Sequence, residues 1–99
     1  MPLRISRSSL VARDIGQIWS YIAKDNVAAA DRMVQSLNDA IRLLARNPEL
    51  GSAVEIRAGM RCKPVHRRYL ILYIATRHEL QVLRILHSAR DYERILSDE

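Results

Sequence analysis

Two apolar runs separated by four polar residues dominate the second half of the sequence. They span Tyr69–Ala75 and Leu80–Leu86, are rich in Leu, Ile, Val and Tyr, and contain neither Gly nor Pro. That composition is typical of two paired β-strands joined by a short connection. Alternation places apolar side chains on both faces of the strands, which predicts that the pair lies near the middle of a small sheet. In the first run, Tyr69, Ile71 and Tyr73 are expected on one face of the strand. Leu70, Leu72 and Ile74 are expected on the other.

The first half of the chain has the periodicity of two amphipathic helices, which we expect near residues 8–23 and 26–46. Apolar residues recur there at steps of three or four, the spacing that gathers them on one face of a helix. Ser8 or Ser9 is expected to cap the first helix by accepting a hydrogen bond from a free amide of the first turn. Pro48 ends the second helix, because the residue before a proline avoids helical geometry. The short link between them predicts an antiparallel hairpin.

The remaining segments complete an α+β arrangement. Leu3–Ser6 alternates apolar and polar residues and is expected to form a short strand. A third strand is expected over residues 60–67, where Pro64 removes a backbone donor and so indicates an edge or a bulge. Residues 1–99 are therefore predicted to form a single α+β domain, in which an N-terminal strand and an antiparallel helix hairpin pack on a small antiparallel sheet. That sheet is expected to contain residues 60–67, 69–75 and 80–87.

The chain is basic, and its charge is unevenly distributed. Sixteen Lys and Arg residues against eleven Asp and Glu residues give a net charge of +5. Between Arg57 and Arg90, Glu79 is the only acidic residue. This bias favours an acidic partner or a nucleic acid, and a solvated basic surface is the alternative.

The sequence contains no motif that is typical of a metal or cofactor site. Its single cysteine, Cys62, has no partner for an internal disulfide and no Cys/His spacing of the kind that binds metals. A Gly-rich phosphate loop and a serine-nucleophile motif are also missing. We therefore expect neither a metal nor a cofactor. No stretch has the pattern of a signal peptide or a membrane span, so a cytoplasmic location is expected.

Two groups of polar residues are candidates for a functional site. His87, Arg90 and Tyr92 follow the second apolar run, and in a ribonuclease such residues could act as base, phosphate-binding group and orienting group. The same cluster could instead fix the corner between the last strand and the tail. The second group is a basic edge around Pro64 that suits an acidic partner peptide. It consists of Arg61, Lys63, Arg67 and Arg68.

Several short motifs occur in an order that is typical of one protein family. They are Arg13-Asp14-Ile15, Ile18-Trp19-Ser20-Tyr21, Asn47-Pro48 followed by Gly51, Arg57-Ala58-Gly59-Met60-Arg61, the run Tyr69–Tyr73, and Val82–Asp91. In this order, over nearly the whole chain, the sequence resembles the ParE toxins of bacterial toxin–antitoxin modules, within the wider RelE/ParE superfamily. The family's closing strand motif usually reads His-Gly-Ala-Arg-Asp, and here Ser88 replaces the glycine.

The resemblance implies a growth-inhibiting toxin, of the kind associated with plasmid stabilisation, that an acidic, ParD-like antitoxin encoded beside it neutralises. ParE-like toxins are associated with poisoning of DNA gyrase, whereas RelE-like relatives cut messenger RNA in the ribosome. The RelE-like enzymes commonly have an arginine in the middle strand. This sequence has Leu70 at the corresponding position. This departure favours gyrase over a ribosome-dependent mRNA endoribonuclease. A decayed toxin that only sequesters antitoxin is a third interpretation.

On this interpretation, the toxic surface lies at the end of the closing strand and in the tail. The expected target-binding residues are Arg84, His87, Arg90 and Tyr92. Arg84 interrupts an apolar strand, so its charge must find a partner or reach solvent. The antitoxin is expected to be partly disordered when free and to fold along the helix hairpin and the basic edge, whose four residues are the expected antitoxin-binding residues. Trp19 and Tyr21 on the helix hairpin are the next candidates for contact with the target.

Overall fold

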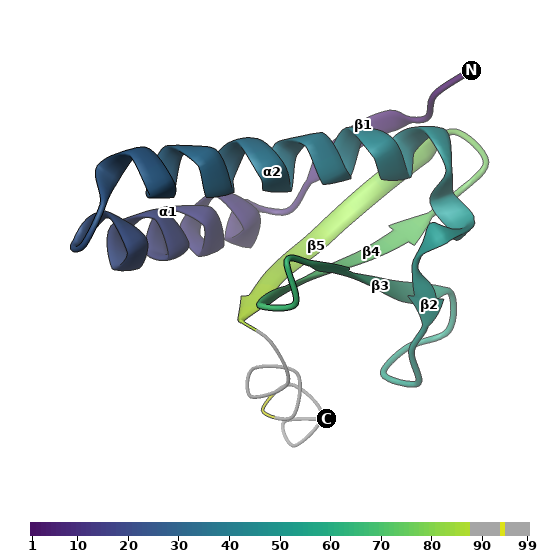
Figure 1. Ribbon diagram of the computed structural model, residues 1–99. Helices are drawn as coiled ribbons and strands as arrows, with labels where there is room; N and C mark the ends of the chain where they lie inside the picture. Colours follow the sequence, from purple (N-terminus) through teal and green to yellow (C-terminus); the bar gives the residue numbers. More distant parts are fainter. Residues whose placement is uncertain (88–93, 95–99) are drawn as a thin grey trace.

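Two helices pack against one face of a five-stranded sheet (Figure 1). A computed structural model describes residues 1–87 and Arg94. Its elements, in chain order, are β1 (Arg4–Arg7), α1 (Ser9–Ala23), α2 (Val27–Arg46), the 3₁₀ helix η1 (Pro48–Leu50), β2 (Ser52–Ala53), β3 (Met60–Val65), β4 (Tyr69–Ala75) and β5 (Glu79–His87). Each α-helix begins one residue later than the sequence predicts and ends at the predicted residue. The predicted α+β class is confirmed.

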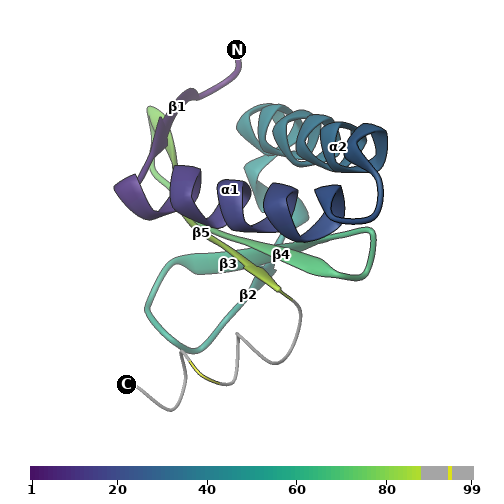
Figure 2. The same cartoon turned by 90° about the vertical axis from the view of Figure 1, so that its left-hand side faces the viewer.

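The sheet has the strand order β1-β5-β4-β3-β2, so β4 and β5 lie inside it, as their apolar faces predict. The pairs among β2, β3, β4 and β5 are antiparallel, and β1 pairs with β5 in parallel. The expected antiparallel core is confirmed, and β1 makes the whole sheet mixed. Parallel partners need a long connection, which the helix hairpin and the other strands supply. Figure 2 shows both helices on the same side of the sheet.

Two apolar clusters lie on opposite faces of the sheet. The larger one joins the sheet to the helices and includes Tyr69, Ile71 and Tyr73 of β4. The smaller one lies on the other face around Met60 and Leu72. The alternation predicted for β4 is therefore confirmed. Burial of each large apolar side chain contributes about 1.5–3 kcal/mol, so the helix-side cluster is the main source of stability. The helices contribute to it Val11, Ile18, Leu37, Ile41 and Leu44.

The β3 strand carries Pro64 on an open edge of the sheet. β2 pairs only with Arg61 and Cys62, so no described strand flanks the rest of β3 on that side. The Met60 carbonyl accepts a hydrogen bond from the Val54 N–H on the β2 side, at 3.0 Å. Backbone groups of every second residue point to the same side of a strand, so the nitrogen of Pro64 points outward. The missing N–H of the proline therefore costs the ladder no hydrogen bond, and the predicted edge position is confirmed.

The β3 strand ends two residues earlier than the sequence predicts. His66 and Arg67 have φ values of 52° and 61°, and a backbone in the left-handed region cannot continue a strand. The Arg68 N–H donates to the Val65 carbonyl at 3.2 Å and closes a tight turn into β4. The turn therefore removes Arg67 from the predicted strand, and the side chains of Arg67 and Arg68 are exposed in the connection.

A close approach between Gly51 and Tyr73 connects η1 to the sheet. The Tyr73 hydroxyl accepts from the Gly51 N–H at 2.8 Å and donates to the Pro48 carbonyl at 2.6 Å. Burial raises the pKa of Tyr73, so the hydroxyl remains a donor at neutral pH. A Cβ atom on Gly51 would lie 2.7 Å from Cε1 of Tyr73 and 2.9 Å from the Cys62 carbonyl. Only glycine fits here without a shift of its neighbours.

Gly16 lies in the middle of α1 and has no such packing role. The residue is exposed, and a Cβ atom built on it would meet no described atom within 4 Å. Glycine inside a helix costs about 1 kcal/mol relative to alanine, because it loses more backbone entropy on folding. Gly16 therefore weakens α1 without allowing a closer contact with α2.

The two glycines should respond to alanine in opposite directions. We expect Gly16→Ala to raise the free energy of unfolding by about 1 kcal/mol. Gly51→Ala should lower it by about 1–3 kcal/mol, because the added methyl group overpacks the Tyr73 contact. Urea denaturation of the two variants and the unchanged protein measures both effects. A destabilised Gly16→Ala variant would contradict an open position at this glycine.

Candidate functional site

A β-bulge in β5 directs two consecutive side chains to the sheet face opposite the helices. Leu72 pairs with Arg84 and Tyr73 pairs with Val82, so Leu83 is an extra residue without its own partner on β4. Leu83 packs with the apolar cluster on the face away from the helices, and Arg84 lies opposite Leu72 on that same face. Bulges re-aim side chains in this way and are common beside functional sites.

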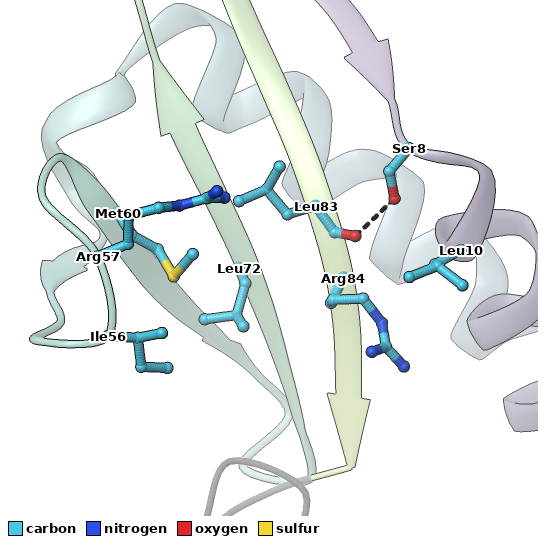
Figure 3. Close-up of a pocket in the computed structure, with 8 residues that line it drawn as sticks. All are labelled: Ser8, Leu10, Ile56, Arg57, Met60, Leu72, Leu83 and Arg84. Carbon is cyan, nitrogen blue, oxygen red and sulfur yellow. Dashed lines mark hydrogen bonds between the residues drawn. The ribbon is translucent and has the colours of Figure 1, made fainter. Parts of the chain in front are cut away.

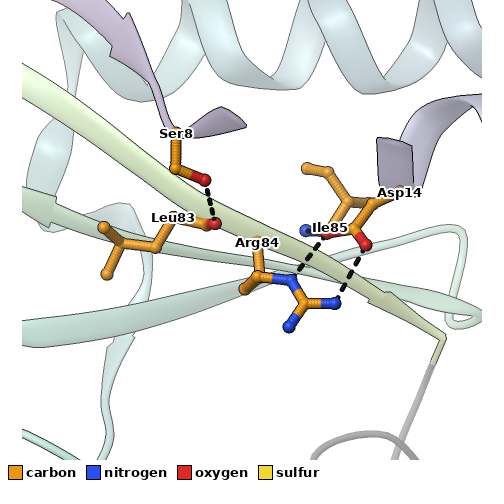
Figure 4. A network of polar contacts seen from close by, with 5 residues as sticks. All are labelled: Ser8, Asp14, Leu83, Arg84 and Ile85. Atoms are coloured by element: carbon orange, nitrogen blue, oxygen red, sulfur yellow. Dashed lines mark hydrogen bonds and ion pairs between the residues drawn. The ribbon is translucent and has the colours of Figure 1, made fainter. Parts of the chain in front are cut away.

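The start of α1 holds the bulged part of β5 in place (Figure 4). β1 ends at Arg7, so no described strand pairs with the backbone of β5 beyond Val82 on that side. The Ser8 N–H donates to the Val82 carbonyl at 2.9 Å, and the Ser8 hydroxyl donates to the Leu83 carbonyl at 2.6 Å. Ser8 is the N-cap residue of α1, but its side chain makes no capping hydrogen bond. The capping role expected of this serine is therefore replaced by a contact with the sheet.

Asp14 of α1 continues this contact through an ion pair with Arg84. Its two carboxylate oxygens accept from Nε and Nη2 of Arg84 at 2.9 and 3.0 Å, and one of them also accepts from the Ile85 N–H at 3.0 Å. Asp14 is 6% exposed, whereas the Arg84 side chain is 35% exposed. A buried carboxylate is tolerated only when its charge and lone pairs are satisfied, and these three bonds satisfy them.

The sequence left two options for the charge of Arg84, a partner or solvent, and the structure shows Asp14 as a partner. The position of Asp14 in the sequence indicates that its carboxylate is buried, because Asp14 lies on the same stripe of α1 as Val11, Ile15 and Ile18. A carboxylate in a buried stripe needs a cation or several donors. The sequence analysis did not assign Asp14 this role. Contact of Arg84 with a target stays a prediction.

An apolar groove lies beside the bulge (Figure 3). Its volume is about 370 Å³. One wall comes from the loop after β2 and the start of β3, the floor from β4 and β5, and the other wall from the start of α1. The lining residues are Ser8, Leu10, Ile56, Arg57, Met60, Leu72, Leu83 and Arg84. In Figure 3 the side chain of Arg57 extends across the groove toward Leu83.

The end of β5 presents His87 beside Tyr69. The two rings meet edge to face, with centroids 5.4 Å apart and planes at 73°, and His87 is exposed. Burial raises the pKa of Tyr69, the Arg68 charge opposes that shift, and Tyr21 adds to it. Arg90 and Tyr92, the other residues predicted here, lie outside the described residues.

Trp19 and Tyr21, the secondary candidates from the sequence, lie on different sides of α1. The Trp19 indole N–H donates to an Asp31 carboxylate oxygen at 2.9 Å, and the residue is 37% exposed. Tyr21 is 69% exposed. The structure does not bring Trp19 and Tyr21 into one surface.

The four residues of the predicted basic edge have different environments. Arg61 donates to the Gly51 carbonyl at 2.6 Å and so supports the contact between η1 and the sheet. Lys63 is half-buried in β3, whereas Arg67 and Arg68 are exposed in the following turn. The two turn residues are therefore the most accessible cations of this group.

The described part of the chain contains no cluster of three or more His, Cys, Asp or Glu side chains placed to hold a metal ion. Cys62 is half-buried in β3, and burial raises the pKa of its thiol. Among the described residues, no helix is both long and apolar enough to span a membrane.

The sequence model of one family matches residues 5–92, which include most of β1, the helix hairpin and β5. That family is described as the ParE toxin of the type II toxin–antitoxin system parDE. The chain belongs to the ParE toxin family. The matched range contains the Asp14–Arg84 pair, the bulge and the groove, so all three lie within the family domain.

Two known proteins are similar to this ParE family member. The Y4kP protein of Sinorhizobium fredii (strain NBRC 101917 / NGR234), which carries the name of a predicted toxin, is 27% identical over 93 residues. The match covers 94% of this chain and 96% of Y4kP. A solved structure of the chromosomal ParDE system from P. aeruginosa has a TM-score of 0.75 and 21% identity, over 87% of this chain and 96% of that one. The structural match supports the ParE-type fold.

The Asp14–Arg84 contact can be tested by its effect on stability. We expect Asp14→Ala to lower the free energy of unfolding by about 2–3 kcal/mol, because Arg84 and the Ile85 N–H lose their acceptor. Asp14→Asn should cost less, since an amide oxygen can still accept from Ile85. The matched control is Asp39→Ala, which breaks the exposed pair with Arg42 and should change stability by less than about 0.5 kcal/mol. Equal losses at the two sites, measured by denaturation, would contradict an anchoring role for Asp14.

Proposed function

We propose that this ParE family member stops growth by binding DNA gyrase, and that an acidic antitoxin encoded beside it neutralises it in the cytoplasm. Membership of the ParE family carries this proposal, because the family is defined as the toxin of a two-component system. The P. aeruginosa relative is itself described as part of a ParDE system. The net charge of +5 suits an acidic partner.

The chemistry of the groove supports a binding function over RNA cleavage. Phosphodiester cleavage needs a base and an acid within reach of the same bond. The lining of the groove offers two arginines and one serine and is otherwise apolar. Leu70, where the cleaving relatives commonly have an arginine, packs with the apolar cluster on this face. These features suit contact with a protein better than acid–base chemistry.

The surface near the end of β5 is the proposed contact with the target. The proposed target-binding residues among those described are His87, which pairs with Tyr69 of the helix-side cluster, and Arg84, which lies on the opposite face of β5. Arg90 and Tyr92, the other proposed residues, lie outside the described residues. His87 is exposed, and its ring packs against the buried Tyr69, which gives it a rigid support. An exposed side chain on a rigid strand is well placed to contact another protein. The same His87 is the feature that favours the alternative, a ribosome-dependent mRNA endoribonuclease.

Two assays on the purified protein separate these functions. We expect inhibition of gyrase supercoiling and accumulation of cleaved DNA, with messenger RNA intact in a translating extract. Relaxation of DNA by topoisomerase I is the control and should be unchanged. Cut messenger RNA with unaffected gyrase would contradict the proposal and establish the nuclease. A protein that does neither, yet binds the antitoxin, would be a decayed toxin.

The basic edge is the proposed first contact for the antitoxin. Arg67 and Arg68 are its most accessible members, and Arg61 and Lys63 are partly buried in β3. We expect Arg67→Glu/Arg68→Glu to slow antitoxin association about tenfold at low salt, because exposed charges mainly steer encounter. The difference should shrink as salt is added. Stopped-flow measurements at two salt concentrations test this. Unchanged association at low salt would exclude the turn as a docking point.

A further inference from the structure

Three arginines from distant parts of the sequence lie at one end of the molecule, and we call them the three-arginine surface. They are Arg4 at the start of β1, Arg46 at the end of α2 and Arg77 in the turn between β4 and β5. The Arg4 N–H donates to the His78 carbonyl at 3.1 Å, and the Leu3 N–H donates to the Ala45 carbonyl at 2.8 Å. These bonds place the start of β1 between the other two segments. Figure 1 shows all three segments at the end of the molecule where the chain begins.

The charges of these arginines are available to a partner. All three residues are exposed, and none of them forms an ion pair with another described residue. Two acidic residues lie in the adjoining segments. Glu79 pairs with Arg4 across β1 and β5, but it is half-buried and its carboxylate accepts from Gln81 at 3.1 Å. The other is Glu49 on η1. Three guanidinium groups therefore leave this end with an excess of positive charge, which attracts anions.

Structural roles explain these arginines only one at a time. A charge on an edge strand discourages pairing with another chain, and this applies to Arg4 because β1 is at the edge of the sheet. A cation in the last turn of a helix interacts favourably with the helix dipole, and this applies to Arg46. Neither effect involves Arg77, and neither requires the three charges to lie at the same end of the molecule.

The chemistry of this surface suits the backbone of a nucleic acid duplex. A guanidinium group only donates hydrogen bonds, and its planar fork matches two oxygens of a phosphate. Single-stranded nucleic acids are usually held by bases stacked on aromatic side chains. Among the described residues the exposed tyrosine and tryptophan side chains are Tyr21 and Trp19 in the last turns of α1. Those turns lead into the connection with α2, which Figure 1 shows at the opposite end of the molecule.

We propose that the three-arginine surface binds the phosphate backbone of duplex DNA and does not read its sequence. Contacts to phosphates position a protein on DNA but carry no sequence information. The inference deepens the proposed function and rests on it for one step, because gyrase works on DNA. There, the contact would hold the toxin on the DNA next to the enzyme. Binding to DNA alone does not depend on gyrase and is measured without it.

The salt dependence of DNA binding tests the surface. Fluorescence anisotropy with a short labelled duplex of mixed sequence gives the affinity at several salt concentrations. Each phosphate contact contributes about 0.9 to the slope of log affinity against log salt concentration. We expect Arg4→Gln/Arg46→Gln/Arg77→Gln to make this slope shallower by about 3 and to weaken binding at low salt at least about tenfold. Absence of DNA binding by the unaltered protein at low salt would overturn the proposal.

A matched variant controls for net charge. Arg13→Gln/Lys24→Gln/Arg32→Gln removes the same charge from exposed positions on the helix hairpin, and its slope should change by less than about 1. Equal changes in the two variants would show that only overall charge matters, which would overturn the assignment. Denaturation curves of both variants establish that they fold.

Other ligands test the class of partner. We expect weaker binding to a single strand of the same sequence and to an RNA duplex than to the DNA duplex. Tighter binding of either one would overturn the assignment to duplex DNA. Antitoxin affinity should be the same in the three-arginine variant and in the hairpin control. A loss of antitoxin binding in the three-arginine variant alone, with DNA binding retained, would assign the surface to the antitoxin instead.

Gyrase assays separate this inference from the proposed function. We expect the three-arginine variant to need about tenfold more protein for the same accumulation of cleaved DNA, whereas the hairpin control matches the unaltered protein. Equal potency of a variant that no longer binds DNA would overturn the role beside gyrase. If the unaltered protein inhibits gyrase but does not bind free DNA, the surface assignment is wrong and the proposed function stands. If it binds DNA through these arginines but leaves gyrase unaffected, the surface stands and the gyrase proposal fails.

Discussion

The contact of Asp14 with Arg84 and the Ile85 N–H decides how the helix layer and the sheet fit together. β1 ends at Arg7, and α1 takes over the edge of β5 from that point. The buried carboxylate can sit there only while both the guanidinium and the amide reach it. One side chain therefore fixes the position of α1 along β5. The neighbouring hydrogen bond from Ser8 to Leu83 has the same effect at the bulge.

The groove is a consequence of that arrangement. Because the bulge puts Leu83 and Arg84 on the same face, an apolar side chain and a cation lie next to each other where strict alternation would separate them. α1 starts at the same point and adds Leu10 as a wall. Structural support and the groove thus come from the same few residues, and a change in the anchor should alter the shape of the groove.

At the opposite side of the sheet, Gly51 and Tyr73 hold the loop that carries the other wall. The Tyr73 hydroxyl binds both Gly51 and the Pro48 carbonyl, and Arg61 binds the Gly51 carbonyl. Burial of Tyr73 keeps these bonds away from water, where they would be weaker. The basic residue that sequence reasoning assigned to partner binding therefore also supports the fold, so the effects of changing Arg61 would mix both roles.

The sequence by itself determined the two α-helices and the strands β1, β3, β4 and β5 in their order along the chain, but it did not predict η1 or β2. The helix ranges followed from apolar steps of three and four, and the inner position of β4 and β5 followed from apolar residues on both faces. The tertiary structure alone decided the partner of Arg84, the bulge at Leu83 and the parallel pairing of β1. Asp14 and Arg84 are 70 residues apart in the chain, and periodicity carries no information on which distant charges meet. The position of the bulge in β5 also cannot be read from the sequence. Residues on both faces of this strand are apolar, so the extra residue does not interrupt a pattern. His66 and Arg67 adopt positive φ although neither is glycine, since closure of the turn between two fixed strands requires it.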